Sequence, residues 1–275
     1  MINTRIIKLV IDGHLHLYPC YNLKHALDSL KANLERIARA EFHTDLLQDI
    51  FKIGFLVESR GLNYFEQFRN GTIRAALQGL EIVSGSDGLS ITIIQQGKPD
   101  LCLIAGKQII TSENIEILGI GFDESVPDHL PAHEVITQII DAGGIPVLPW
   151  APGKWLFKRG RIIEKLIENY SPEQLVLQDT SLRPTILPLP GLMRKGMEKG
   201  FSLIAGSDPL PIPGEEQWMG TYGFIYEGPF DTDAPVESMR QILFNAPSII
   251  LAGRRNKLWN AACRLCRLKA AKRSS

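Results

Sequence analysis

The sequence predicts an α/β fold: a (β/α) barrel of a distorted TIM type, with an inserted antiparallel β-meander. Short apolar strands alternate with amphipathic helices from residue 115 onward, and these strands are apolar almost throughout, as buried parallel strands are. The length of 275 residues suits one barrel, which takes about 250 residues. We expect the barrel to span residues 1–253 and a basic helix or tail to span residues 254–275.

The first part of the chain combines barrel elements with the meander. Apolar residues at helical spacing predict a helix, β-branched runs predict strands, and Gly-rich segments at 84–88 and 96–100 have the composition of hairpin turns. The expected elements are a strand at 6–10, a helix at 25–40, a strand at 51–57 ending at Glu58, and meander strands at 80–83, 89–95 and 101–105. The meander therefore occupies about residues 80–105.

In the second part of the chain, strands and helices alternate regularly. Gly143 and Gly144 end one helix, as glycine commonly does. The expected strands are 115–120, 145–148, 174–178, 201–205 and 248–251, and the expected helices are 132–142, 161–169, 192–199 and 236–244.

Composition limits the classes of partner. Thirty basic and thirty acidic residues cancel, so no global field favours nucleic acid, and no apolar run is long enough for a membrane span. Four scattered cysteines and the lack of a signal-peptide pattern predict a cytoplasmic protein. The sequence leaves the oligomeric state open.

The tail at 254–275 carries many Lys and Arg residues and no acid. Contact with a phosphate-rich partner or a membrane surface is one interpretation. We favour a solvated final helix whose apolar residues Leu258, Trp259 and Leu265 dock on the barrel.

The run from Ile11 to His16 is the most informative local feature. Because strand side chains alternate, we expect Asp12, His14 and His16 to share one face. Two imidazoles and a carboxylate are suitable ligands for a divalent metal. The alternative is a pair of histidines that hydrogen-bond to their neighbours without a metal.

The active site of a barrel lies at the carboxyl ends of its strands. Asp208 follows a late strand and is a candidate metal ligand or general base, although it also suits a turn cap before Pro209. Glu113 is a second candidate catalytic acid or base, beside the strand at 115–120.

Basic and aromatic residues at other strand ends are candidates for substrate binding. Trp150 and Lys154 follow one strand, and Asp179 and Arg183 follow the next. Lys154 and Arg183 can hold a phosphate or carboxylate. Alternatively, Asp179 pairs with Arg183 and no anion binds there.

These motifs resemble the polymerase-and-histidinol-phosphatase (PHP) family of metal-dependent phosphoesterases, within the amidohydrolase-like barrels. The segment 12–16 looks like that family's first metal motif, 205–208 looks like its late Gly-Ser-Asp motif, and 143–148 resembles the strand before its His-Pro element. The resemblance implies a distorted barrel that binds one to three Zn, Mn or Fe ions and hydrolyses phosphate esters.

The sequence departs from the family pattern at three ligand positions. Trp150 and its neighbours stand where the family has a metal-binding His, Pro209 and Leu210 stand where it has another, and Gln108 replaces a bridging Glu. We therefore expect one divalent ion per chain, or none, held by His14, His16 and acids drawn from Asp12 and Asp208. The predicted function is a metal-dependent hydrolase acting on a phosphoester or another small anionic substrate, and the alternative is a catalytically degenerate PHP-like barrel that binds a ligand or serves as a scaffold.

Overall fold

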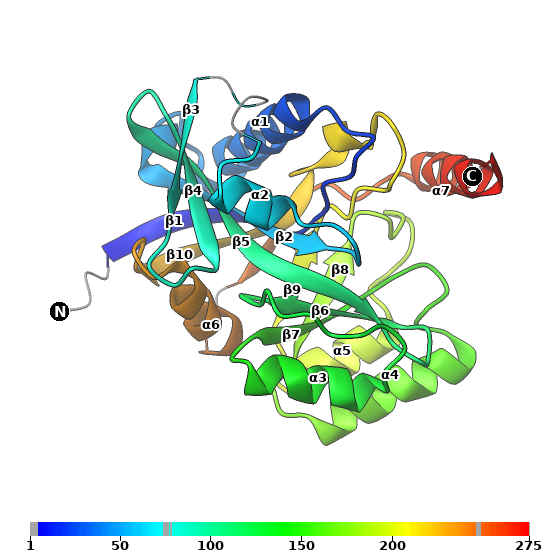
Figure 1. Cartoon of the computed structure of the whole chain (residues 1–275). Helices are drawn as coiled ribbons and strands as arrows, with labels where there is room; N and C mark the ends of the chain where they lie inside the picture. The colour runs from blue at the N-terminus through cyan, green and yellow to red at the C-terminus, as the bar shows by residue number, and fades with distance from the viewer. Residues whose placement is uncertain (1–4, 74–76, 78, 246–248, 275) are drawn as a thin grey trace.

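A computed structural model describes residues 5–73, 77, 79–245 and 249–274. Its eleven strands form one sheet that curves into a nearly closed barrel, and the helices pack around it (Figure 1). The strands are β1 (Arg5–Leu15), β2 (Ile50–Glu58), β3 (Leu80–Ser84), β4 (Ser90–Gln95), β5 (Lys98–Ile110), β6 (Glu116–Ile120), β7 (Ile145–Pro149), β8 (Val176–Thr180), β9 (Leu203–Gly206), β10 (Tyr222–Phe230) and β11 (Ile250–Gly253). The α-helices are α1 (Leu23–Phe42), α2 (Tyr64–Arg69), α3 (Ala132–Asp141), α4 (Phe157–Asn169), α5 (Gly191–Glu198), α6 (Pro235–Asn245) and α7 (Leu258–Ser274), and short 3₁₀ turns are η1 (Leu47–Asp49) and η3 (Glu215–Trp218).

The strand order along the sheet is β11-β10-β1-β2-β5-β6-β7-β8-β9. Strands β1, β2 and β5 run parallel, as do β7, β8 and β9, so the predicted barrel is confirmed for most of its wall. The strand predicted at 115–120 departs from this pattern, because β6 is antiparallel to both of its neighbours. Its connection to β5 is too short for the crossover of a dozen or more residues that a parallel pair needs.

The meander is smaller than the sequence suggested. Only β3 and β4 lie outside the main strand order, whereas the third expected strand is part of β5. The first half of β5 pairs with β4 and its second half pairs with β6, while β2 runs along its other edge. One long strand therefore serves both the meander and the barrel wall.

Strand β10 was not predicted. It is antiparallel to β1 and to β11, and so extends the sheet beyond the first strand. Gly223, Gly228 and Pro229 interrupt its apolar pattern, and such residues usually mark a break in a strand. Of the strand expected at 248–251, residue 248 lies outside the described residues and the observed strand begins at Ile250.

The barrel nearly closes where β9 approaches β1. The backbone N–H of Asp208, just past β9, donates a hydrogen bond of 3.0 Å to the carbonyl oxygen of His14 on β1. A side chain at Gly206 has no room here, because a Cβ atom would lie 2.3 Å from Cβ of His14. Glycine is therefore required for this close approach of the two backbones.

Two apolar clusters pack on the two faces of β1. Leu9 and Ile11 lie in the barrel interior with residues from all the neighbouring wall strands. Val10 and Leu15 pack together on the outer face beneath α1. These two residues are an odd number of positions apart, so regular alternation would place them on opposite faces. A register shift between Asp12 and Leu15 in the pairing with β2 explains why they share one.

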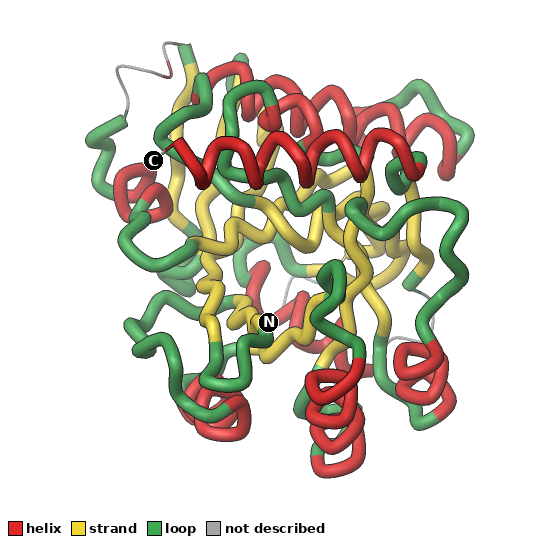
Figure 2. The backbone as a smooth tube through the Cα atoms, turned by 90° about the vertical axis from the view of Figure 1, so that its right-hand side faces the viewer, coloured by secondary structure: helices red, strands yellow, loops and turns green. Residues whose placement is uncertain are grey.

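The C-terminal helix α7 lies against one side of the molecule (Figure 2). Leu265 packs against Leu182, Leu210 and Ile212, which confirms its predicted docking on the barrel. The rest of that prediction is wrong, because Leu258 and Trp259 are 57% and 76% exposed. They belong to the first turn of the helix, about two turns before Leu265. Within the described residues, no helix combines the length and apolar character needed to cross a bilayer.

Candidate metal and active site

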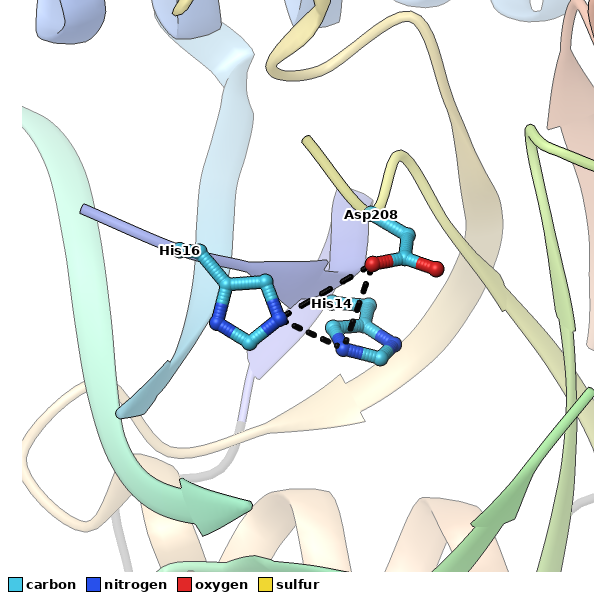
Figure 3. A group of neighbouring side chains, drawn as sticks. All are labelled: His14, His16 and Asp208. Carbon is cyan, nitrogen blue, oxygen red and sulfur yellow. Dashed lines mark hydrogen bonds and ion pairs between the residues drawn. The ribbon is translucent and has the colours of Figure 1, made fainter. Parts of the chain in front are cut away.

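Three potential metal ligands meet at the carboxyl end of the barrel. The Nε2 atoms of His14 and His16 lie 3.0 Å apart, and Oδ1 of Asp208 lies 3.8 Å from each of them (Figure 3). Both imidazoles are buried, and the carboxylate is 15% exposed. The potential ligand atoms lie within 4.8 Å of one another, so residues at the end of β1 and in the loop after β9 form one cluster.

The register shift in β1 orients the histidines. After the shift, Leu15 points to the outer face, and His14 and His16 therefore point to the inner face. Asp12 precedes the shift, and like Val10 it points the other way. The prediction that Asp12 shares a face with the two histidines is consequently wrong, and the physical reason is the bulge.

Asp12 instead anchors the loop that carries Asp208. Its Oδ1 accepts hydrogen bonds from the backbone N–H groups of His14 and Ser207, at 3.0 and 2.8 Å. Its Oδ2 accepts one of 2.7 Å from the N–H of Gly220. Burial raises the pKa of Asp12 to about 6, although these hydrogen bonds oppose the shift. Both oxygens of this predicted ligand are thus engaged with backbone, outside the cluster of three.

The orientation of the His14 ring is set by Gln178 on β8. Gln178 donates from Nε2 to the carbonyl oxygen of Gly13 at 2.8 Å, so its Oε1 faces Nδ1 of His14, 2.7 Å away. Because an amide oxygen only accepts, Nδ1 of His14 carries a hydrogen. In the neutral ring, Nε2 then has a free lone pair directed toward His16 and Asp208, which is the arrangement that a metal-binding histidine needs.

Burial governs the protonation of the other two groups. It lowers the pKa of His16 well below the ordinary value, and the nearby charge of His14 lowers it further. It also raises the pKa of Asp208, against the opposing effect of the His14 charge. A neutral imidazole is the form that binds a metal. The environment of His16 therefore favours ligation over ion pairing.

The backbone of Asp208 is in an unusual conformation. Its φ of 49° lies in the left-handed region, which non-glycine residues adopt rarely. The hydrogen bond from its N–H to His14 holds this conformation, and it aims the carboxylate back toward the two rings. Strain of this kind is often found at functional sites.

Glu113, a predicted catalytic residue, lies at the start of helix α3. Both of its carboxylate oxygens lie 3.1 Å from the backbone N–H of Ala132, the first residue of that helix. Burial raises the pKa of Glu113, but hydrogen bonds from Thr111, Ala132 and its own backbone outweigh this effect and lower it overall. The structure therefore does not bring Glu113 into the cluster of three.

Arg183 and Asp179 form a buried, two-pronged ion pair. Nε and Nη2 of Arg183 donate to Oδ1 and Oδ2 of Asp179 at 2.7 and 2.6 Å, and Tyr222 donates its hydroxyl hydrogen to the same Oδ2. Nη1 of Arg183 donates to the carbonyl oxygens of Leu187 and Pro188. Of the two alternatives that the sequence left open, the structure has the one in which Asp179 neutralises Arg183.

Lys154 and Trp150 differ in their surroundings. Lys154 donates a hydrogen bond to Glu116 and remains 26% exposed. Its charge, like that of Glu116, acts on the pKa of Asp208, so it lies within electrostatic reach of the cluster. Trp150 packs in the apolar cluster beneath α3 and α4.

Two cavities lie at opposite ends of the barrel. A cavity of about 180 Å³ lies beyond the carboxyl end of β2, and its lining includes Glu58, Lys107 and Gln108 but none of the three clustered residues. Oε1 of Gln108 lies 3.4 Å from Nε2 of His14, and Lys107 forms ion pairs of 2.8 Å with Glu58 and Asp123. A larger cavity, of about 1060 Å³, lies at the amino ends of β1 and β2 and has no contact with the cluster of three.

Comparison with known proteins shows a shared fold. No family model matches the chain, and no curated protein matches its sequence. The structure of PsfC from Pseudomonas syringae is similar, with a TM-score of 0.53 and 10% identity over 98% of this chain and 99% of PsfC. At that identity the similarity establishes the fold alone.

Two further solved structures overlap less closely. One is a two-domain protein from Bacteroides vulgatus described as containing a predicted PHP-like metal-dependent phosphoesterase, with a TM-score of 0.47 and 12% identity over 92% of this chain and 66% of that one. The other is a lesion-specific endonuclease from Pyrococcus furiosus, with a TM-score of 0.43 and 11% identity over 90% of this chain and 58% of that one.

Sequence reasoning missed several residues around the cluster. Gln178 directly precedes Asp179. The available signal was its place at the end of the strand predicted at 174–178. Arg264 was counted only as part of the basic tail, yet it is buried and reaches the loop of Asp208. Glu215, its ion-pair partner, had no sequence signal, because it lies in the short 3₁₀ turn η3 between β9 and β10, where no periodic pattern marks it.

Proposed function

We propose that this protein is a metal-dependent hydrolase that holds one divalent ion, of Zn, Mn or Fe, between His14, His16 and Asp208. The observation that supports this most strongly is the convergence of three ligand atoms with the lone pair of His14 set by Gln178. The fourth position of the ion would be open, as in catalytic rather than structural sites.

The donor set fits such an ion. Bonds from zinc to imidazole nitrogen are about 2.0–2.1 Å long, so two Nε2 atoms 3.0 Å apart both reach a single ion. When bound, the ion supplies a Lewis acid that lowers the pKa of a coordinated water. The buried walls around His14 and His16 limit the access of bulk water, which strengthens the electrostatic interactions inside.

The proposed substrate is a phosphoester or another small anion, and Lys154 is the better candidate to bind it. The preference for phosphoesters comes from the resemblance of the sequence motifs. Arg183 is only 4% exposed and fully paired, whereas Lys154 is more exposed and has one carboxylate partner to exchange for a ligand. Glu116, released from Lys154, would then be free to accept a proton near the site.

The test begins with metal binding. The full chain, stripped with chelator, is titrated with Zn²⁺ or Mn²⁺ in a calorimeter, alongside a His14→Ala/His16→Ala variant. We expect one ion per wild-type chain and none per variant. A His25→Ala/His133→Ala variant removes two exposed helical histidines and is the matched control.

The loaded chain is then assayed with p-nitrophenyl phosphate and bis(p-nitrophenyl) phosphate. Hydrolysis that depends on the ion and is lost in the His14/His16 variant is the expected result. Binding of an ion without turnover of either ester would favour the degenerate barrel. Failure of the wild type to bind any ion would overturn the proposal altogether.

A further inference from the structure

One basic residue of the C-terminal helix is buried within the body of the protein. Arg264 on α7 is 3% exposed, whereas the other Lys and Arg residues of this helix are exposed. Its partner Glu215 in η3 is fully buried. Oε2 of Glu215 accepts a hydrogen bond of 2.8 Å from Nε of Arg264 and lies 2.6 Å from Nη2 in the ion pair. The guanidinium also lies over the ring of Trp218, 4.9 Å from its centre. Such burial is costly unless the charge has several good partners.

Arg264 also contacts the segment that carries the candidate metal ligand. Its Nη2 donates to the carbonyl oxygen of Asp208 at 3.3 Å. Its Nη1 donates at 3.2 Å to Oγ of Ser181, which itself donates to the carbonyl oxygen of Ser207 at 2.5 Å. Two consecutive carbonyl groups beside the ligand are therefore tied, directly or through one hydroxyl, to the same guanidinium.

These contacts help to hold the backbone of Asp208 in its left-handed conformation. The N–H of Asp208 is bonded to His14, and its left-handed φ must be maintained for the carboxylate to face the histidines. The next residue is Pro209, which has no N–H to add a further restraint. Glu215 contributes as well, because its Oε2 accepts from the N–H of Leu210 at 3.3 Å.

We infer that Arg264 is a positioning residue that holds Asp208 in place to bind the metal, so that the C-terminal helix is part of the site. This inference rests on the proposed function. Removal of Arg264 would free the carbonyl of Asp208 and leave Glu215 buried without its partner. The carboxylate would then sample positions away from the two Nε2 atoms, and the ion would bind more weakly. Loss of a residue that orients a ligand typically weakens metal binding by about tenfold to a hundredfold.

The experiment compares three variants of the full chain by titration with Co²⁺, whose visible absorption reports the ligand geometry. Arg264→Ala removes all the contacts, and we expect at least a tenfold weaker affinity and an altered spectrum. Arg264→Lys keeps the charge beside Glu215 but lacks the planar fork, so we expect a smaller loss. Arg267→Ala removes an exposed arginine of the same helix, which donates a hydrogen bond to the carbonyl oxygen of Pro213, and is the control for charge.

Circular dichroism tests whether each variant is folded. If Arg264→Ala does not fold, the Co²⁺ titration of Arg264→Lys tests the inference in its place. Equal Co²⁺ affinity and spectrum in Arg264→Lys and Arg267→Ala would overturn the inference while leaving the metal site intact. If the wild type binds no Co²⁺, the proposed function fails, and the inference is judged from a crystal structure of Arg264→Lys. Displacement of the Asp208 carboxylate from both histidines would support it, and an unmoved carboxylate would refute it.

Discussion

The backbone N–H of Asp208 donates a hydrogen bond to the carbonyl oxygen of His14, so the two principal members of the candidate site are joined by main chain as well as by side chain. This contact lies where β9 meets β1, at the seam that nearly closes the barrel. The geometry of the candidate metal ligands and the closure of the barrel therefore depend on the same few atoms.

Gly206→Ala should damage the seam. The new Cβ would lie 2.3 Å from Cβ and 2.5 Å from the backbone nitrogen of His14, and backbone cannot yield as a flexible side chain can. We expect a loss of about 1–3 kcal/mol in the free energy of unfolding, measured with urea, together with weaker metal binding. Gly191→Ala is the control, because a Cβ there meets nothing within 4 Å. If Gly206→Ala were as stable as the wild type, the close approach of the backbones at Gly206 and His14 would be refuted.

Gln178→Met should weaken metal binding without unfolding the protein. Methionine has a similar shape but neither accepts from Nδ1 of His14 nor donates to Gly13, so the His14 ring loses its fixed tautomer and orientation. We expect about a tenfold loss of affinity by calorimetry. Gln241→Met, on an exposed face of α6, should bind the ion as the wild type does. An unchanged affinity in Gln178→Met would remove Gln178 from the description of the site.

Arg183→Ala should affect stability rather than anion binding. Asp179 is fully buried, and without the arginine it keeps only Tyr222 as a side-chain partner. Breaking a buried pair in this way costs about 3–5 kcal/mol. Any rise in Tm caused by phosphate should be the same in the variant as in the wild type, whereas Lys154→Met should abolish it and the exposed Lys158→Met should not. A phosphate response lost only in Arg183→Ala would restore Arg183 as the anion-binding residue.

Glu113→Gln should lower stability near neutral pH and have little effect in acid. The folded protein lowers the pKa of Glu113 below its ordinary 4.5, so the ionised carboxylate stabilises the fold above that pH. This contribution is lost as the pH falls through the folded-state pKa. We expect a difference of about 0.5–2 kcal/mol at pH 7, typical of a helix cap, that disappears as the pH falls through the folded-state pKa. A variant with full stability and impaired hydrolysis would instead support the catalytic role predicted for Glu113.

The main features of the fold were predictable because they depend on local pattern. Buried strands and amphipathic helices have periods that are visible in a single sequence, and residues at strand ends of a barrel converge by topology. His14, His16 and Asp208 were therefore predicted together, and the structure places them together. The roles assigned to them stay proposals until the ion is measured.

The remaining features depend on contacts that no local pattern encodes. The bulge beyond Asp12 reverses which face the following side chains occupy, and a shift of one residue leaves no mark on composition. The sequence did not decide whether Arg183 pairs with Asp179 or binds an anion, because ion pairs and anion sites use the same side chains. Arg264 resembled its exposed neighbours in the tail, and only its burial against Glu215 distinguishes it.

The seam has a consequence for the order in which the protein acquires its parts. Both imidazoles lie at or just after the end of β1, whereas Asp208 and Arg264 follow β9 and come later in the chain than most of the barrel wall. A chain emerging from the ribosome therefore carries two of the three proposed ligands well before the third is made. An ion held by all three would be captured only once β9 has met β1, and it would seal an assembled barrel instead of nucleating it. Because such an ion would bind the finished fold in preference to the open chain, its concentration in the surroundings would shift the balance between the two by mass action.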